Sequence, residues 1–206
     1  MRNLRDPPGT VWYKWRVAMK RFVLAACTLF LLLTSVSEHA QAQSHAEQIA
    51  RATLAAPPAM QADAMVIRMA ADGSHEVLRD GSNGLMCWDR SDEPTRSFSV
   101  QCTSVENLDR VKQNRAWNMS GKTAEAIRAM RDAAEGDGSR KIPTFGSVYY
   151  TLNGEDADSA NIHLTVAVPF ATAESLGLPD QGSYTKTGTW IMEPGTTSAH
   201  LMLPGR

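Results

Sequence analysis

A short apolar segment near the N-terminus most constrains what this chain can fold into. Residues 22–33 are uncharged and mostly apolar, and they follow the basic pair 20–21. This order and length are typical of a secretory signal, whereas a membrane-spanning helix needs about 20 apolar residues. Residues 40–42 then provide the small-x-small pattern that signal peptidase accepts. We therefore expect residues 1–42 to be a cleaved signal peptide, which leaves residues 43–206 to fold.

The same N-terminal region allows other interpretations. Residues 1–18 resemble a spurious upstream extension more than part of a signal, so we expect translation to start at Met19. Residues 24–27 have the composition of a lipobox that ends in Cys27, but the apolar run continues for six more residues beyond it. This position argues against a lipid anchor, and an uncleaved anchor is the remaining alternative.

The size and charge of the remaining chain indicate one domain. Removing 42 of the 206 residues leaves 164, and we expect a loosely ordered lead over 43–63 before a single globular domain over 64–206. The first 42 residues carry six of the 21 basic and two of the 22 acidic residues, so the rest carries 15 basic and 20 acidic residues and a formal charge of −5. No basic patch or run is evident, so neither nucleic acid nor stable membrane insertion after signal cleavage is expected.

Cysteine usage supports a periplasmic or secreted location. Cys27 leaves with the signal, and Cys87 and Cys102 remain. In an oxidising compartment these two residues should form a disulfide. A loop of this length gives about 3 kcal/mol of stabilisation in a chain-entropy treatment.

The residue pattern predicts strands, then two helices, then strands. Helices are expected over 104–117, with Ser104 as N-cap, and over 123–135, with Thr123 as N-cap. The first three strands are expected to form a meander with a hairpin turn at Asn83 and Gly84. The order predicts an α+β fold with a mainly antiparallel sheet and two central helices on one face. The expected strands are 65–69, 75–79, 85–88, a segment around Phe98 and Val100, 147–152, 163–169, 188–192 and 199–203.

One pattern runs through the segments Val77 to Arg79, Asn83 with Gly84, Cys87, Cys102, Trp117, Trp190 to Met192 and Ala199 to Met202. Together these segments resemble a group of uncharacterised bacterial secreted or periplasmic proteins with no known activity. The resemblance covers most of residues 43–206 and departs at Leu85 and over 121–138. It implies an exported single domain and no particular chemistry.

No catalytic motif is complete in this sequence. The expected function is therefore a small non-catalytic binding or interaction module of the cell envelope, acting on an envelope protein or a small ligand, with no cofactor. One alternative is a metal-assisted hydrolytic enzyme that uses His163 and His200. Another is a structural accessory of an envelope assembly, which would expose one large apolar patch.

Four residues are the candidate ligand contacts: His163, His200, Trp190 and Tyr150. Strand alternation places both histidines away from the more apolar face of their strands. If the two strands were neighbours in register, the imidazoles would lie about 5 Å apart at Cβ and could share a metal. We expect instead that each histidine forms hydrogen bonds within the sheet or at its surface, and that the aromatic residues belong to the core or its edge.

Overall fold

The computed structural model describes residues 44–183 and 188–203. The predicted signal peptide, its cleavage site and Cys27 lie outside the described residues. The chain divides into two compact units, Met1–Ala46 and Glu47–Arg206. All of the described strands belong to the second unit. Within the described ranges, no helix is long and apolar enough to cross a membrane.

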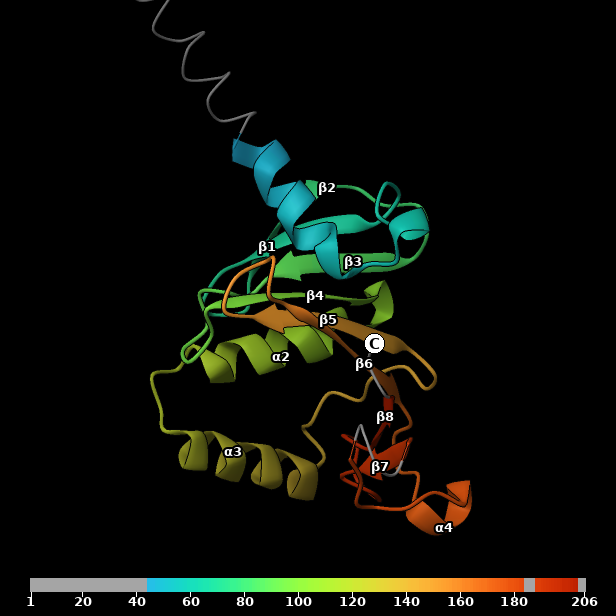
Figure 1. Cartoon of the computed structure of the whole chain (residues 1–206). Helices are drawn as coiled ribbons and strands as arrows, with labels where there is room; N and C mark the ends of the chain where they lie inside the picture. Colours follow the sequence, from blue (N-terminus) through green and yellow to red (C-terminus); the bar gives the residue numbers. More distant parts are fainter. Residues whose placement is uncertain (1–43, 184–187, 204–206) are drawn as a thin grey trace, which may run out of the picture. The chain divides into compact units, whose positions relative to one another are not determined.

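The described strands of this unit form one eight-stranded sheet (Figure 1). Their order is β2-β1-β3-β4-β5-β6-β8-β7, and every neighbouring pair is antiparallel except β1 and β3. The α+β prediction with a mainly antiparallel sheet is therefore confirmed. The strands are β1 (Met65–Met69), β2 (His75–Arg79), β3 (Leu85–Asp89), β4 (Phe98–Ser104), β5 (Val148–Gly154), β6 (Asn161–Ala167), β7 (Trp190–Met192) and β8 (His200–Leu203).

The predicted meander of the first three strands is wrong, because β3 pairs with β1 and not with β2. β3 is apolar on both faces and nearly all buried, so it needs a neighbour on each side, whereas the more polar β2 suits an edge. The connection crosses the start of β1, where the amide of Ser82 donates to Asp63 O at 2.9 Å. Gly81 permits this crossing, because a Cβ there would lie 2.1 Å from the backbone nitrogen of Met65.

Both predicted helices form and begin at the predicted caps. Ser104 accepts a hydrogen bond from the amide of Glu106 at the start of η3 (Val105–Asn107), which leads into α2 (Leu108–Asn118). Thr123 caps α3 (Ala124–Asp137) by accepting from the amide of Ala126. Figure 1 shows α2 and α3 on the same side of the sheet. A single turn, α4 (Ala173–Leu176), follows β6.

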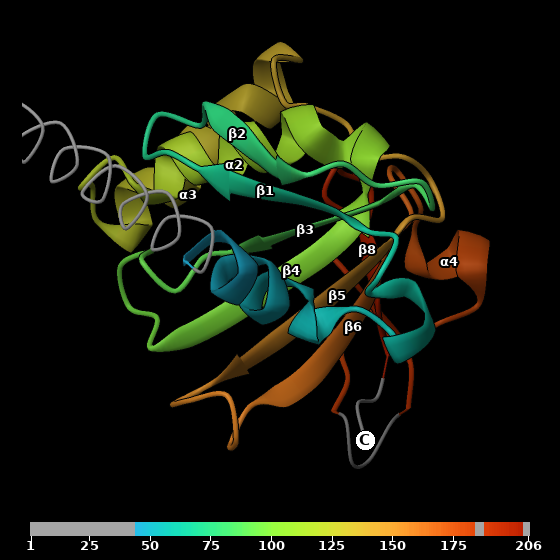
Figure 2. The same ribbon diagram turned by 90° about the horizontal axis from the view of Figure 1, so that it is seen from above.

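The opposite face of the sheet is covered by the segment that precedes β1. Residues 47–52 are helical and continue into η1 (Thr53–Ala55) and η2 (Pro58–Met60). Figure 2 shows this segment against β3 and β4, with α2 and α3 behind the sheet. Ala52, Ala55 and Ala56 are buried against Val66, Phe98 and Val100. The lead expected over 43–63 therefore supplies core, and the compact unit begins at Glu47 instead of Ala64.

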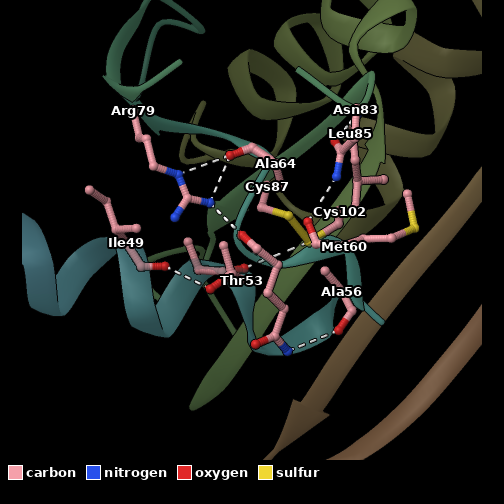
Figure 3. The surroundings of a disulfide bond; sticks show 12 residues. Ile49, Thr53, Ala56, Met60, Ala64, Arg79, Asn83, Leu85, Cys87 and Cys102 are labelled. Atoms are coloured by element: carbon pink, nitrogen blue, oxygen red, sulfur yellow. Dashed lines mark hydrogen bonds between the residues drawn. A yellow bond between two sulfur atoms is a disulfide. The ribbon is translucent and has the colours of Figure 1, made fainter. Parts of the chain in front are cut away.

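The disulfide between Cys87 and Cys102 joins β3 to β4 at directly paired positions (Figure 3). Both cysteines are completely buried in the core beneath η1. Nearby, Asn83 donates to Met60 O at 2.9 Å, and Arg79 donates to Ala64 O at 2.7 Å. The predicted pairing of the two cysteines is confirmed.

Candidate functional site

Two adjoining cavities lie between the sheet and the helices α2 and α3. Their volumes are about 370 Å³ and about 240 Å³. They share part of their lining, so we treat them as one site and call it the arginine cleft. Its two ends are named the tryptophan end, which Trp88 lines, and the histidine end, which His200 lines. The shared lining residues are Arg90, Gln101, Asn114, Arg131 and Tyr149.

Strand alternation makes the floor of the arginine cleft polar. Tyr149 pairs with Thr165 across β5 and β6, and Gln101 pairs with Thr151 across β4 and β5, so these side chains share one face. Gln101 donates from Nε2 to Thr151 Oγ1 at 2.6 Å and accepts from Arg90 at 2.9 Å. The apolar residues that alternate with them point to the other face.

Cationic side chains gather around the cleft although residues 43–206 carry a formal charge of −5. Among the residues that the structure describes, eight cationic and two acidic side chains line it. The sequence-based expectation that the chain lacks a basic patch is therefore wrong for this cavity. The cations are Arg90, Arg96, Arg110, Arg115, Lys122, Arg128, Arg131 and Arg140, and the acids are Glu93 and Glu193.

At the tryptophan end, the arginines are paired with carboxylates. Glu93 is buried and accepts from Arg90 at 2.9 Å and from Arg96 at 3.0 Å. Arg115 donates to Asp92 and lies 3.7 Å from Glu93. The hydrogen bond with Asp92 raises the pKa of Arg115, and the same bond lowers the pKa of Asp92. These contacts compensate Arg90, Arg96 and Arg115, whereas Lys122 and Arg128 also line this end.

At the histidine end, Arg110, Arg131 and Arg140 lie close enough to affect one another's ionisation. Burial, followed by the charges of Arg110 and Arg131, lowers the pKa of Arg140 to about 10. Burial also lowers the pKa of Arg110. The ion pair of Arg140 with Glu135 is long, at 3.9 Å. Repulsion among these cations is therefore only partly compensated.

Arg131 and Arg140 each hold a buried Nε–H that lacks an acceptor. In the described part of the chain, these are the two buried side-chain nitrogen or oxygen atoms without a hydrogen-bond partner. We call them the open Nε donors. The remaining groups of Arg140 are held by Gln113 Oε1 at 2.9 Å and Asn114 Oδ1 at 2.8 Å, and its guanidinium stacks on Trp117. Arg131 donates from Nη2 to Asn118 at 2.9 Å. A buried donor without an acceptor is costly, so this end is short of acceptors.

Glu135 connects α3 to the loop before β8. Its carboxylate accepts from Thr197 N at 3.0 Å and from Ser198 Oγ at 3.0 Å. Burial alone would raise the pKa of Glu135, but these hydrogen bonds and the one from Thr197 Oγ1 outweigh it and lower the pKa. Arg110 donates to Ser198 Oγ at 2.6 Å, so the same loop is held from α2 as well.

Backbone strain also marks the lining. Thr95 at the tryptophan end has φ of 70°, and Glu193 at the histidine end has φ of 52°. A non-glycine residue rarely adopts positive φ, and for a β-branched residue such as Thr95 it is a clear outlier. Such strain persists where the surroundings hold the residue in place, which is common at functional sites.

Tyr149 and His200 add further polar groups to the floor. Burial raises the pKa of Tyr149 to about 12, so its phenol stays protonated and can donate. His200 Nδ1 lies 2.8 Å from Ser198 O, and because a carbonyl oxygen only accepts, Nδ1 carries the proton. Both residues line the histidine end.

The structure separates the four candidate ligand contacts. His200 lines the arginine cleft, whereas Tyr150 is on the opposite face, packed against the cluster around the disulfide. Trp190 is buried beside Gly182, where a Cβ would lie 2.3 Å from its ring. His163 shares a sheet face with His200, but the residue opposite His200 is Ala167. Four residues of strand separate the two positions by about 13 Å, so the close cross-strand pair does not form.

The pKa of His163 nevertheless depends on His200. Burial lowers the pKa of His163, and the charge of His200 lowers it further. Among the residues described, no group of three or more His, Cys, Asp or Glu side chains could hold a metal ion.

The sequence alone does not reveal the arginine cleft, because the residues that line it come from separate segments. Arg90 follows β3, Arg110 is on α2, Arg131 is on α3 and Arg140 follows α3. A partial signal existed on α2, where Arg110, Asn114 and Asn118 form an i, i+4, i+8 polar row beside the buried Val111. A polar row on a helix is usually a solvated face, and the sequence alone does not show that α3 covers it.

Comparisons with known proteins add no relative. No protein-family model, curated protein or solved structure matches this chain.

Proposed function

We propose that this protein is an exported, non-catalytic binding module of the cell envelope whose arginine cleft holds an anionic ligand. One observation carries the proposal: Arg110, Arg131 and Arg140 line the histidine end together, and the repulsion among them is only partly compensated. An anion at this end would supply acceptors and relieve the repulsion among the three cations. A neutral ligand would do only the first.

The electrostatic gain is large enough to support binding. Two unit charges about 4 Å apart interact by about 4 kcal/mol at an effective dielectric constant near 20. The cavity volumes of about 370 Å³ and about 240 Å³ suit a small molecule better than a protein surface. The cleft therefore favours a small anion as ligand.

The protonation of Arg140 and Tyr149 suits the binding of an anion. A general acid or base needs a pKa near the working pH. Arg140, with a pKa of about 10, and Tyr149, with a pKa of about 12, both keep their protons near neutral pH. Such groups position an anion and stabilise its charge without exchanging protons with it.

The Cys87–Cys102 disulfide and the apolar segment 22–33 support export. Protein produced with its own N-terminus in a bacterial host should be recovered from the envelope as a chain beginning at Gln43 with no free thiol. Intact mass and thiol titration measure both properties. A lipid-modified Cys27, or two free thiols per chain, would contradict export to the cell envelope as a cleaved, disulfide-bonded protein.

Calorimetric titration tests the proposed ligand class. Phosphate, sulfate and citrate, added to the exported protein at constant ionic strength, should include at least one saturable ligand. Arg131→Gln should weaken its binding about tenfold or more, because a hydrogen bond to a charged group contributes about 1.5–3 kcal/mol. The matched control is Arg68→Gln, which removes an exposed arginine paired with Glu76 outside the cleft. Absence of binding by all three anions, or equal losses in the two variants, would refute the proposal.

A further inference from the structure

Building on the proposed function, we infer that the ligand is a phosphate monoester with an uncharged, apolar organic body. The phosphoryl group lies at the histidine end among Arg110, Arg131 and Arg140, and the body extends toward Trp88 at the tryptophan end.

The origin of the three arginines favours a tetrahedral anion. Arg110 comes from α2, Arg131 from α3, and Arg140 from the segment that follows α3. All three line the histidine end, so an anion there would face cationic side chains that come from three different elements. A phosphoryl group offers three oxygens in three directions, whereas a carboxylate lies in one plane and is satisfied by one guanidinium fork.

The two carboxylates near the histidine end do not fully neutralise its arginines, which favours a strongly charged anion as ligand. The Glu135 carboxylate already accepts from Thr197 and Ser198, and its ion pair with Arg140 is 3.9 Å long. Glu193 is the acidic residue that lines this end among the described residues. A phosphate monoester carries a charge of about −1.5 to −2 near pH 7. It would therefore neutralise the three arginines better than the two carboxylates do alone.

The tryptophan end suits an uncharged body. Trp88, Val111 and Ile127 line it, and its volume of about 370 Å³ leaves room beyond a phosphoryl group. Three of the arginines there, Arg90, Arg96 and Arg115, are paired with Glu93 and Asp92, and Lys122 and Arg128 line the same end. An uncharged apolar group would bury surface against Trp88, Val111 and Ile127.

The test compares small probes in the exported full-length domain. Inorganic phosphate, phenyl phosphate, benzoate and phenol are titrated at fixed pH and ionic strength. Phenyl phosphate should bind about tenfold tighter than inorganic phosphate, because its ring is buried, and also tighter than benzoate or phenol. Arg131→Gln should weaken both phosphates by about tenfold. Ile127→Ser should weaken phenyl phosphate toward the level of inorganic phosphate and leave inorganic phosphate unchanged, with circular dichroism verifying that each variant is folded.

The outcomes separate this inference from the proposed function. If inorganic phosphate binds at the arginines and phenyl phosphate binds no tighter, the apolar body is refuted and the anion-binding function stands. If benzoate binds tighter than phenyl phosphate, the phosphate class is refuted and the function again stands. If none of these anions, nor sulfate or citrate, binds, the proposed function itself fails.

A vesicle experiment distinguishes a phosphate ester carried by a lipid from a soluble one. Phosphatidylcholine vesicles that contain phosphatidic acid present the same phosphate monoester on a lipid. Sedimentation of the protein with these vesicles, reversed by phenyl phosphate, would identify a lipid headgroup as the ester. Binding of phenyl phosphate without sedimentation would identify a soluble ester. Sedimentation that phenyl phosphate does not reverse would place lipid binding outside the cleft and contradict the inference for lipids.

Discussion

The two ends of the arginine cleft differ in how three arginines at each end are compensated by carboxylates. At the tryptophan end, Glu93 and Asp92 pair with the arginines at distances near 3 Å. At the histidine end, the ion pair between Arg140 and Glu135 measures 3.9 Å, and the open Nε donors remain. The arginines compared are Arg90, Arg96 and Arg115 at the first end and Arg110, Arg131 and Arg140 at the second; Arg128 and Lys122 also line the first end, and Arg90 and Arg131 line both.

This difference indicates what each end does. A compensated network of buried charges holds neighbouring segments together, because removal of one partner leaves the other unpaired. A cluster of cations without that compensation costs folding free energy, which an added anion can recover. The tryptophan end therefore belongs mainly to the fold, and the histidine end is the better candidate for binding.

The largest expected contrast between the ends comes from removing one carboxylate at each. Glu93→Gln should lower the free energy of unfolding by about 3–5 kcal/mol, because it leaves buried arginines without their counter-charge. Glu135→Gln should lower it by about 1 kcal/mol, since an amide can still accept from Thr197 and Ser198. Urea denaturation of both variants measures the difference. Equal losses would remove the distinction between the ends.

Removing one arginine at each end should give a smaller contrast. Arg90→Gln should lower the free energy of unfolding by about 2–3 kcal/mol, because Glu93 loses a charge-assisted hydrogen bond. Arg131→Gln should change it by less than about 1 kcal/mol, because loss of the bond to Asn118 is offset by relief of cation repulsion. The same denaturation experiment applies. A destabilisation of Arg131→Gln as large as that of Arg90→Gln would show that the histidine end is also compensated.

The pH dependence of stability should show the smallest effect. Asp92 and Glu135 have lowered pKa values in the folded protein, so each favours folding when ionised. Their contribution is complete above the unfolded values of 3.8 and 4.5 and is lost as pH falls through the lower folded values. Because both carboxylates are partly exposed, we expect less than about 1 kcal/mol from each.

Unfolding measured from pH 6 to pH 2.5 checks this contribution. The loss of stability below about pH 4.5 should be smaller in Asp92→Asn and Glu135→Gln than in the unmodified protein. An acid loss of the same size in all three proteins would contradict the assignment of these two carboxylates.

The elements of the fold were predictable where local chemistry decides them. Ser104 and Thr123 are caps because their hydroxyls accept from nearby amides, which depends on two or three residues of sequence. The path from β2 to β3 was not predictable in this way. The Asn83–Gly84 pair favours a hairpin, but β3 is buried on both faces and pairs with β1. Tertiary burial overrode the local turn preference.

The candidate site was predictable only at one residue, His200. Its polar position on β8 follows from strand alternation, whereas the arginines around it are up to 50 positions apart in the chain, from Arg90 to Arg140. Their convergence depends on where α2 and α3 lie against the sheet. The separation of His163 from His200 likewise depends on register, because Ala167 is the residue paired with His200.

The central claim is that an anion binds among Arg110, Arg131 and Arg140 at the histidine end, and the Nε–H signals of the arginines report on it. Phosphate titrated into ¹⁵N-labelled protein should shift the Nε–H resonances of Arg131 and Arg140 with one common dissociation constant. The resonance of Arg68, which lies outside the cleft, should stay in place. Uniform small shifts of all arginine signals, or shifts that spare Arg131 and Arg140, would contradict an anion site at the histidine end.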